Sequence, residues 1–125
     1  MNKTRGNVSS KEEREEWKQK LKKRLKEYAL RIIRLYDSLP KSGAVHVITH
    51  QLLRSGTSPG AHYAEACRAK SDADFISKIE GALQELEESL YWLELLIEGE
   101  FTTANKLKPL CDETSELMQS LFQWC

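Results

Sequence analysis

The stretch FISKIEGALQELEESLYWLELLI, residues 75–97, decides the fold of this chain. Its apolar residues recur at steps of three or four positions, which places them on one face of an α-helix and leaves the glutamates on the other. The predicted buried face consists of Phe75, Ile79, Ala82, Leu86, Leu90, Leu93 and Ile97. Such a helix is stable when its apolar stripe packs on other helices, so the rest of the chain is expected to supply them.

Three other segments show the same spacing, and no segment alternates apolar and polar residues as a strand would. The four helices are expected at about residues 10–38, 43–69, 72–98 and 103–123. Short connections between amphipathic helices favour antiparallel neighbours. The sequence therefore predicts an all-α, up-down-up-down four-helix bundle, with residues 1–9 as a flexible tail and residues 10–125 as a single domain.

Small polar residues mark the expected helix starts. A serine or threonine oxygen at the N-cap accepts a hydrogen bond from a free backbone amide of the first turn. The expected N-caps are Ser9 or Ser10, Ser71, and Thr102 or Thr103. Gly99 is expected to end the third helix in a left-handed conformation.

The composition excludes several classes of protein. With 125 residues, 30% charged and 40% hydrophobic, the chain is long enough for one ordinary core. No run of eighteen apolar residues exists, so no membrane span is expected. The first ten residues lack the apolar centre of a secretion signal, and the three cysteines are not closely paired, so we expect a cytoplasmic protein. No nucleophile triad or phosphate-binding loop is present, so we expect neither an enzyme nor a cofactor.

The charge is segregated although the net charge is zero. Residues 1–41 hold 13 Lys and Arg against 6 Asp and Glu, whereas residues 71–125 hold 3 against 12. Two faces of the first helix carry the basic residues: Lys20, Arg24, Arg31 and Arg34 near one, and Lys18, Lys22 and Lys26 on another. Three interpretations stay open: a solvated face, docking on the acidic surface of a neighbouring subunit (Glu80, Glu87, Glu88, Glu94), or binding to RNA or DNA.

Small residues are concentrated in GTSPGAHYAEA, residues 56–66. Gly56, Gly60 and Ala64 step by four, so on a helix they form one narrow lane that lets a neighbouring helix approach closely. Pro59 removes a backbone donor and disfavours helical geometry at Ser58. Either a new helix starts there or one long helix is kinked, and we expect the kinked helix.

A polar lane lies beside the small one and consists of Arg54, Ser58, His62 and Glu65. It could form a ligand site or an interface, but a polar network that satisfies itself against another helix is the favoured interpretation. His46 and His50 have the spacing of two metal ligands on one helix. No third ligand is identifiable near them, so we expect no metal, and a metal-binding bundle remains an alternative.

The segment QLLRSGTSPGAHYAEACRAKSDADFISKIEGALQELEESLYWLELL, residues 51–96, resembles the bacterial four-helix-bundle proteins related to those encoded in intervening sequences of large-subunit ribosomal RNA genes. Family members typically carry valine or isoleucine at the position of Pro59 and asparagine at that of His62. The resemblance implies a left-handed bundle that assembles as a ring, typically a homopentamer. A distant relative, the accessory protein of diversity-generating retroelements, binds nucleic acid and a reverse transcriptase. We therefore expect a non-enzymatic oligomeric scaffold, with association with RNA or DNA, or a role as an accessory subunit of a nucleic-acid enzyme, as further expectations.

Overall fold

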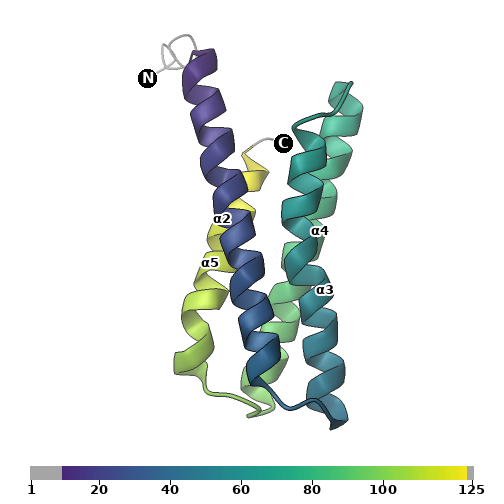
Figure 1. The fold of residues 1–125 in the computed structure, drawn as a ribbon, viewed down its shortest axis with the longest axis vertical. Coiled ribbons are helices and arrows are strands. Elements are labelled where there is room, and N and C mark those ends of the chain that lie inside the picture. Colours follow the sequence, from purple (N-terminus) through teal and green to yellow (C-terminus); the bar gives the residue numbers. More distant parts are fainter. Residues whose placement is uncertain (1–9, 124–125) are drawn as a thin grey trace.

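The computed structural model describes residues 10–123 and consists of four α-helices in that range (Figure 1). They are α2 (Lys11–Ser38), α3 (Gly43–Ala66), α4 (Asp72–Glu98) and α5 (Ala104–Phe122). Each helix runs antiparallel to the next and packs on it, and α5 closes the bundle against α2. In Figure 1, α2 and α3 lie in front of α5 and α4. The prediction of an all-α up-down-up-down bundle is confirmed.

The core is made by the apolar stripes of all four helices. In α4, Ile79, Ala82, Leu86 and Leu93 are fully buried, as the spacing predicts. The other members of that stripe, Phe75, Leu90 and Ile97, are half-buried at its edges. Burying a leucine or isoleucine in this way contributes roughly 1.5–3 kcal/mol, so the stripe is one of the main contributors to the stability of the bundle.

Hydroxyl groups cap three of the four helices at the expected positions. Ser10 accepts from the amide of Glu13 at 3.2 Å, Ser71 from that of Asp74 at 3.1 Å, and Thr103 from that of Lys106 at 3.3 Å. Each satisfies one amide that the helix itself leaves without a partner. Before α3, Ser42 makes no such side-chain hydrogen bond.

The prediction that Gly99 ends α4 in a left-handed conformation is wrong. Gly99 has a φ of −80°, and the left-handed residue is Glu100 with a φ of 61°. The amide of Glu100 donates to Ile97 O at 3.0 Å and that of Phe101 to Leu96 O at 2.9 Å, the two hydrogen bonds of a Schellman motif. The helix itself ends at Glu98 as expected, but the chain reverses at Glu100, one residue later than expected. Gly99 is needed for space instead, since a Cβ there would lie 2.8 Å from the Phe101 ring.

Replacing Glu100 with glycine is expected to stabilise the bundle by about 1 kcal/mol, because a left-handed conformation costs an L-residue roughly that much. The change also removes a negative charge from the carboxyl end of α4, where the helix dipole disfavours it. Urea denaturation followed by circular dichroism measures the effect. Gly99→Ala is the matched variant, and we expect it to destabilise the protein through contact with Phe101. A less stable Glu100→Gly variant would contradict this explanation of the turn.

Helix α3 is continuous through Pro59, so the proline does not start a new helix. Two hydroxyls of the preceding turn donate to backbone carbonyls near it: Thr57 to Leu53 O and Ser58 to Arg54 O, both at 2.7 Å. The helix ends at Ala66 rather than at residue 69. Beyond it, the amides of Arg68 and Ala69 bond three residues back, which tightens the chain into a turn.

Buried hydroxyl groups link the four helices at one height in the core. The Tyr28 hydroxyl of α2 lies 2.7 Å from Thr114 Oγ1 of α5, and Ser55 Oγ of α3 lies 2.8 Å from Ser89 Oγ of α4. Thr114 donates its own proton to Leu110 O, so the phenol is the donor to Thr114. The Ser89 hydroxyl also interacts with the Tyr28 phenol. These contacts set the relative heights of the helices.

Burial raises the pKa of Tyr28 to about 12, and its hydrogen bond to Thr114 lowers it by less. In the unfolded chain a tyrosine titrates near pH 10, so the neutral phenol favours the folded state below that pH. Its contribution is lost as pH rises from about 10 to about 12. The wild-type protein is therefore expected to lose on the order of 2 kcal/mol more stability than Tyr28→Phe across that range. Equal losses in urea denaturation from pH 9 to 12 would contradict this burial effect.

Candidate functional site

The small-residue lane of α3 faces α2. A Cβ built on Gly56 would lie 2.7 Å from Ile32 Cγ1, a distance that real side chains do not tolerate. One turn further, a Cβ on Gly60 would lie 3.7 Å from Leu25 Cβ, which is ordinary contact. The third member, Ala64, borders the same α2–α3 groove. Helices α2 and α3 are therefore closest at Gly56, and the contact is less tight towards the carboxyl end of α3.

The polar lane of α3 faces α4 of the same chain. Arg54 contacts two α4 carboxylates, donating to Glu85 Oε1 at 3.1 Å and to Glu88 Oε2. The Trp92 indole also donates to Glu88 Oε2, at 2.9 Å. Arg54 further donates to Gln51 Oε1. The guanidinium and both carboxylates thus satisfy one another along the α3–α4 seam.

The remaining lane residues continue this seam. The His62 ring packs over Gly81 of α4, where a Cβ would lie 3.5 Å from Cε1. Its Nδ1 atom is 3.9 Å from Glu65 Oε1, and Lys78 Nζ of α4 is 3.3 Å from the same oxygen. Ser58 donates to the backbone of its own helix. The lane is a polar helix–helix contact whose charges are mostly matched within the chain.

The two histidines at the start of α3 lie near each other without forming a metal cluster. The ring centroids of His46 and His50 are 6.3 Å apart, and the His46 ring is 6.0 Å from that of Tyr36. Among residues 10–123, no three His, Cys, Asp or Glu side chains are grouped so that they could hold a metal ion.

Of the four basic residues expected near one face of the first helix, Arg24 forms ion pairs with α5. Arg24 forms two hydrogen bonds with Glu113, at 2.8 and 3.2 Å, and one with Glu116 at 3.3 Å. The hydrogen bonds that Arg24 donates to Glu113 raise the pKa of the guanidinium above its usual value. Arg24 therefore joins α2 to α5 and offers little free charge to a partner.

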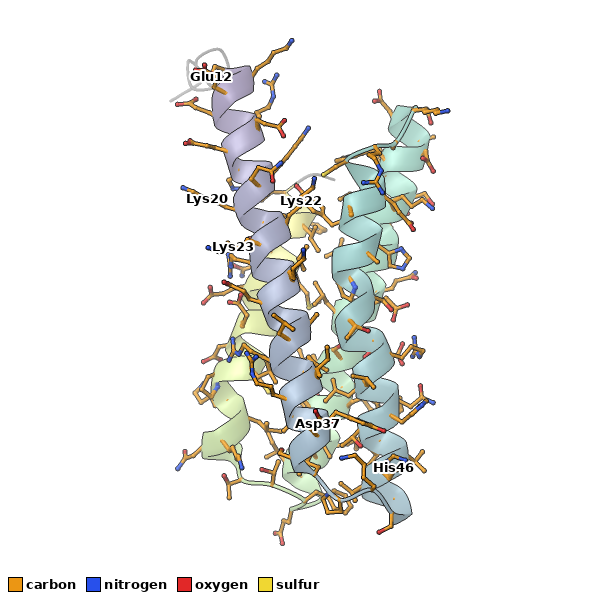
Figure 2. All side chains as sticks on the ribbon, in the orientation of Figure 1. Glu12, Lys20, Lys22, Lys23, Asp37 and His46 are labelled. Carbon is orange, nitrogen blue, oxygen red and sulfur yellow. The ribbon has the colours of Figure 1, made fainter. Side chains whose placement is uncertain are left out.

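Other cations of α2 have no carboxylate within 4.0 Å among the residues that the structure describes. They are Lys18, Lys20, Lys22, Lys23, Lys26, Arg31 and Arg34. Figure 2 places Lys22 over the groove between α2 and α3, and Lys20 and Lys23 on the other side of α2. Lys20 and Lys23 are exposed, and Lys18 and Lys22 are half-buried along their stems. The N-terminal half of α2 thus presents several lysine charges to the solvent.

Some of these lysines lie at the edge of a groove between α2 and α3. Lys22 and Lys26 border it, and its floor is made of small and apolar side chains: Leu25, Ala29, Thr57, Gly60, Ala61 and Ala64. Lys18 borders a second hollow at the turn between α3 and α4, together with Lys70. Lys18, Lys22 and Lys26 recur every four residues, so their Cα atoms are about 6 Å apart along the helix. The spacing of the three lysines can be read from the sequence. The small residues opposite them belong to α3, and their position is known only from the packing of the two helices.

No helix within residues 10–123 combines the length and the apolar character that crossing a membrane requires.

Comparisons with known proteins agree with the fold. The model of the family described as 23S rRNA-intervening sequence protein matches residues 13–123. A solved structure, described as a protein of unknown function from the S23 ribosomal protein family of Bacteroides thetaiotaomicron VPI-5482, is 38% identical to this chain. The superposition covers 86% of this chain and 96% of that one, with a TM-score of 0.79. Among the curated proteins, none matches this chain.

Proposed function

The chain belongs to the family of 23S rRNA-intervening sequence proteins, and from this premise we propose that it is a non-catalytic helical scaffold that assembles with copies of itself and binds RNA. The RNA surface is the N-terminal half of α2, through Lys18, Lys20, Lys22 and Lys23. The protein acts in the cytoplasm.

The observation that carries the RNA proposal is this cluster of lysines without carboxylate partners among residues 10–123. A chain of zero net charge has enough carboxylates to neutralise them, but 11 of its 19 acidic residues lie in α4 and α5, against six in α2. Clustered cations attract a polyanion because each lysine that contacts a phosphate releases a condensed counterion. The lysines are point charges on flexible stems, so they recognise the phosphate backbone and not a base sequence.

A scaffold role is supported by what the polar residues of the α3–α4 seam do. Arg54, Glu85 and Glu88 neutralise one another, and the Trp92 indole donates a hydrogen bond to Glu88 in the same network. Side chains that pair in this way hold helices in register. A catalytic group would instead need a free proton acceptor or donor aimed at a substrate.

Fluorescence anisotropy tests RNA binding directly. A labelled single-stranded RNA of mixed sequence is titrated with the protein at low salt, beside a DNA strand of the same sequence. We expect RNA binding that weakens steeply when salt is added. Absence of binding to RNA at low salt would overturn the RNA proposal, as would binding to DNA alone.

Self-assembly is tested separately, by light scattering coupled to size exclusion. The family resemblance implies five copies in a ring, so we expect a particle with about five times the mass of one chain. A monomer over the whole dilution series would overturn the assembly proposal and leave the RNA proposal standing.

A further inference from the structure

Two hollows follow one another along the seam between α2 and α3. The α2–α3 groove reaches Ala64, and the second hollow continues around the end of α3 to Phe75 of α4. Lys22 and Lys26 border the groove, and Lys18 borders the second hollow. Because these lysines lie on successive turns of α2, the two hollows form one continuous path, which we call the lysine path (Figure 2).

The charge along this path lies mainly on one side. The three lysines of α2 form one edge, whereas the α3 edge of the groove consists of the uncharged Thr57, Ala61 and Ala64. Lys70 borders the far end, and Asp72 is the one carboxylate among the described residues that line either hollow. The path therefore favours a ligand with negative charge along one edge and a neutral body along the other.

An unpaired polynucleotide strand has this asymmetry. Its phosphates follow one edge, separated by a distance similar to one turn of an α-helix, and its sugars and bases project from the other edge. A duplex instead carries phosphates along both outer edges and encloses its bases. The small side chains of the groove, such as Gly60 and Ala61, leave room for sugars beside the lysines. The shape and charge of the path thus fit one strand better than two.

Phe75 supplies an aromatic side chain at the end of the path. It is half-buried and lines the second hollow together with Lys18 and Lys70. Neither lysine has a carboxylate within 4.0 Å in the part of the chain that the structure describes. Proteins that bind single strands combine a positively charged groove with aromatic side chains on which bases stack. The lysine path contains both elements.

We propose that the lysine path binds an unpaired segment of RNA. The phosphates contact Lys18, Lys22 and Lys26. The sugars lie over the small residues of α3, and one base stacks on Phe75. The inference rests on the proposed RNA binding and names the form of RNA that this surface takes. Duplex RNA offers no free base and is expected to bind more weakly, through charge alone. The lysines on the other side of α2 add to the attraction for either form.

The first test compares two forms of the same RNA. A short labelled strand without self-complementarity is bound to the protein at low salt, and unlabelled competitors are added at equal phosphate concentration while anisotropy is recorded. The single strand should compete at least about tenfold better than its duplex. Polyglutamate carries negative charge on a peptide and should displace little RNA at the same concentration of charge. A duplex or polyglutamate that competes as well as the single strand would overturn the inference.

Two variants that leave the charge unchanged test the position of the strand. Ala61→Leu fills the groove, and Phe75→Leu removes the ring but keeps an apolar side chain. Each should lower affinity for the single strand about tenfold and leave affinity for the duplex within about twofold of the wild type. Ala44→Leu is the matched control, since Ala44 is also exposed but lies at the other end of α3. It should leave both affinities unchanged.

Urea denaturation checks that the variants fold. Ala61 is exposed, so Ala61→Leu is expected to fold and tests the groove even where Phe75→Leu is destabilised. A folded variant of either kind that binds the single strand as tightly as the wild type would overturn the lysine path, and RNA binding through the lysines of α2 would still stand. A wild-type protein that binds neither strand nor duplex at low salt would instead overturn the proposed RNA function.

Discussion

Replacing Gly56 with leucine is expected to destabilise the bundle by about 3 kcal/mol or to prevent folding, because α2 leaves no room for a side chain there. A Cβ alone would lie 2.7 Å from Ile32 Cγ1 and 3.0 Å from Cγ2. Ile32 is fully buried and cannot turn aside without displacing the core. Urea denaturation at fixed protein concentration measures the loss.

Substituting alanine for Gly56 and for Gly60 tests the same contact more sharply, because the two changes in the free energy of unfolding should have opposite signs. In an unhindered helix interior, Gly→Ala stabilises by roughly 1 kcal/mol. At Gly60, where a Cβ would meet Leu25 Cβ at 3.7 Å, we expect that stabilisation. At Gly56 we expect destabilisation, and Ile32→Ala should remove most of the conflict in a double-mutant cycle. If Gly56→Ala stabilised the protein as Gly60→Ala does, α2 and α3 would not approach each other as closely as described.

Reversing the four lysines of the proposed RNA surface should reduce affinity for RNA by about a hundredfold or more at low salt, because the proposed phosphate contacts are lost and each site becomes repulsive. The variant carries Lys18→Glu, Lys20→Glu, Lys22→Glu and Lys23→Glu together. Folding is checked by circular dichroism, and the helix content should be retained since none of these side chains lies in the core. Anisotropy with labelled RNA measures the affinity.

A pair of single reversals supplies the matched control for this result. Lys22→Glu changes the charge within the α2–α3 groove, whereas Lys106→Glu makes the same change on α5. Affinity should fall several-fold for the first and stay close to the wild-type value for the second. Equal losses for both variants would mean that RNA responds to the overall charge of the protein and not to this surface.

The fold could be predicted from the sequence because the spacing of the apolar residues in each helix indicates which face is buried. The stripe from Phe75 to Ile97 and the N-caps at Ser10, Ser71 and Thr103 depend only on residues close in sequence. The end of α4 at Glu98 agrees with the prediction, but the left-handed conformation lies at Glu100 and not at Gly99, where a side chain would have no space. Which of two adjacent residues reverses the chain depends on the packing of Phe101, and no local pattern reports that.

The candidate sites were less predictable, because they depend on which helices become neighbours. Arg24 and Lys22 look alike in the sequence, yet Arg24 faces Glu113 of α5 and Lys22 faces the small residues of α3. The hydrogen bond between Tyr28 and Thr114 likewise joins residues far apart in the chain. A periodic pattern fixes the side of a helix on which a residue lies, but the residue opposite is known only once the bundle is assembled.

The salt dependence of RNA binding tests the central claim most directly, since it counts phosphate contacts. With four lysines on a single strand, the logarithm of the binding constant should fall against the logarithm of salt concentration with a slope of about −3. The four-lysine variant, where its residual binding can be measured, should give a much flatter line. Wild-type binding that is insensitive to salt, or a variant that keeps both the affinity and the slope of the wild type, would contradict the assignment of α2 as the RNA surface.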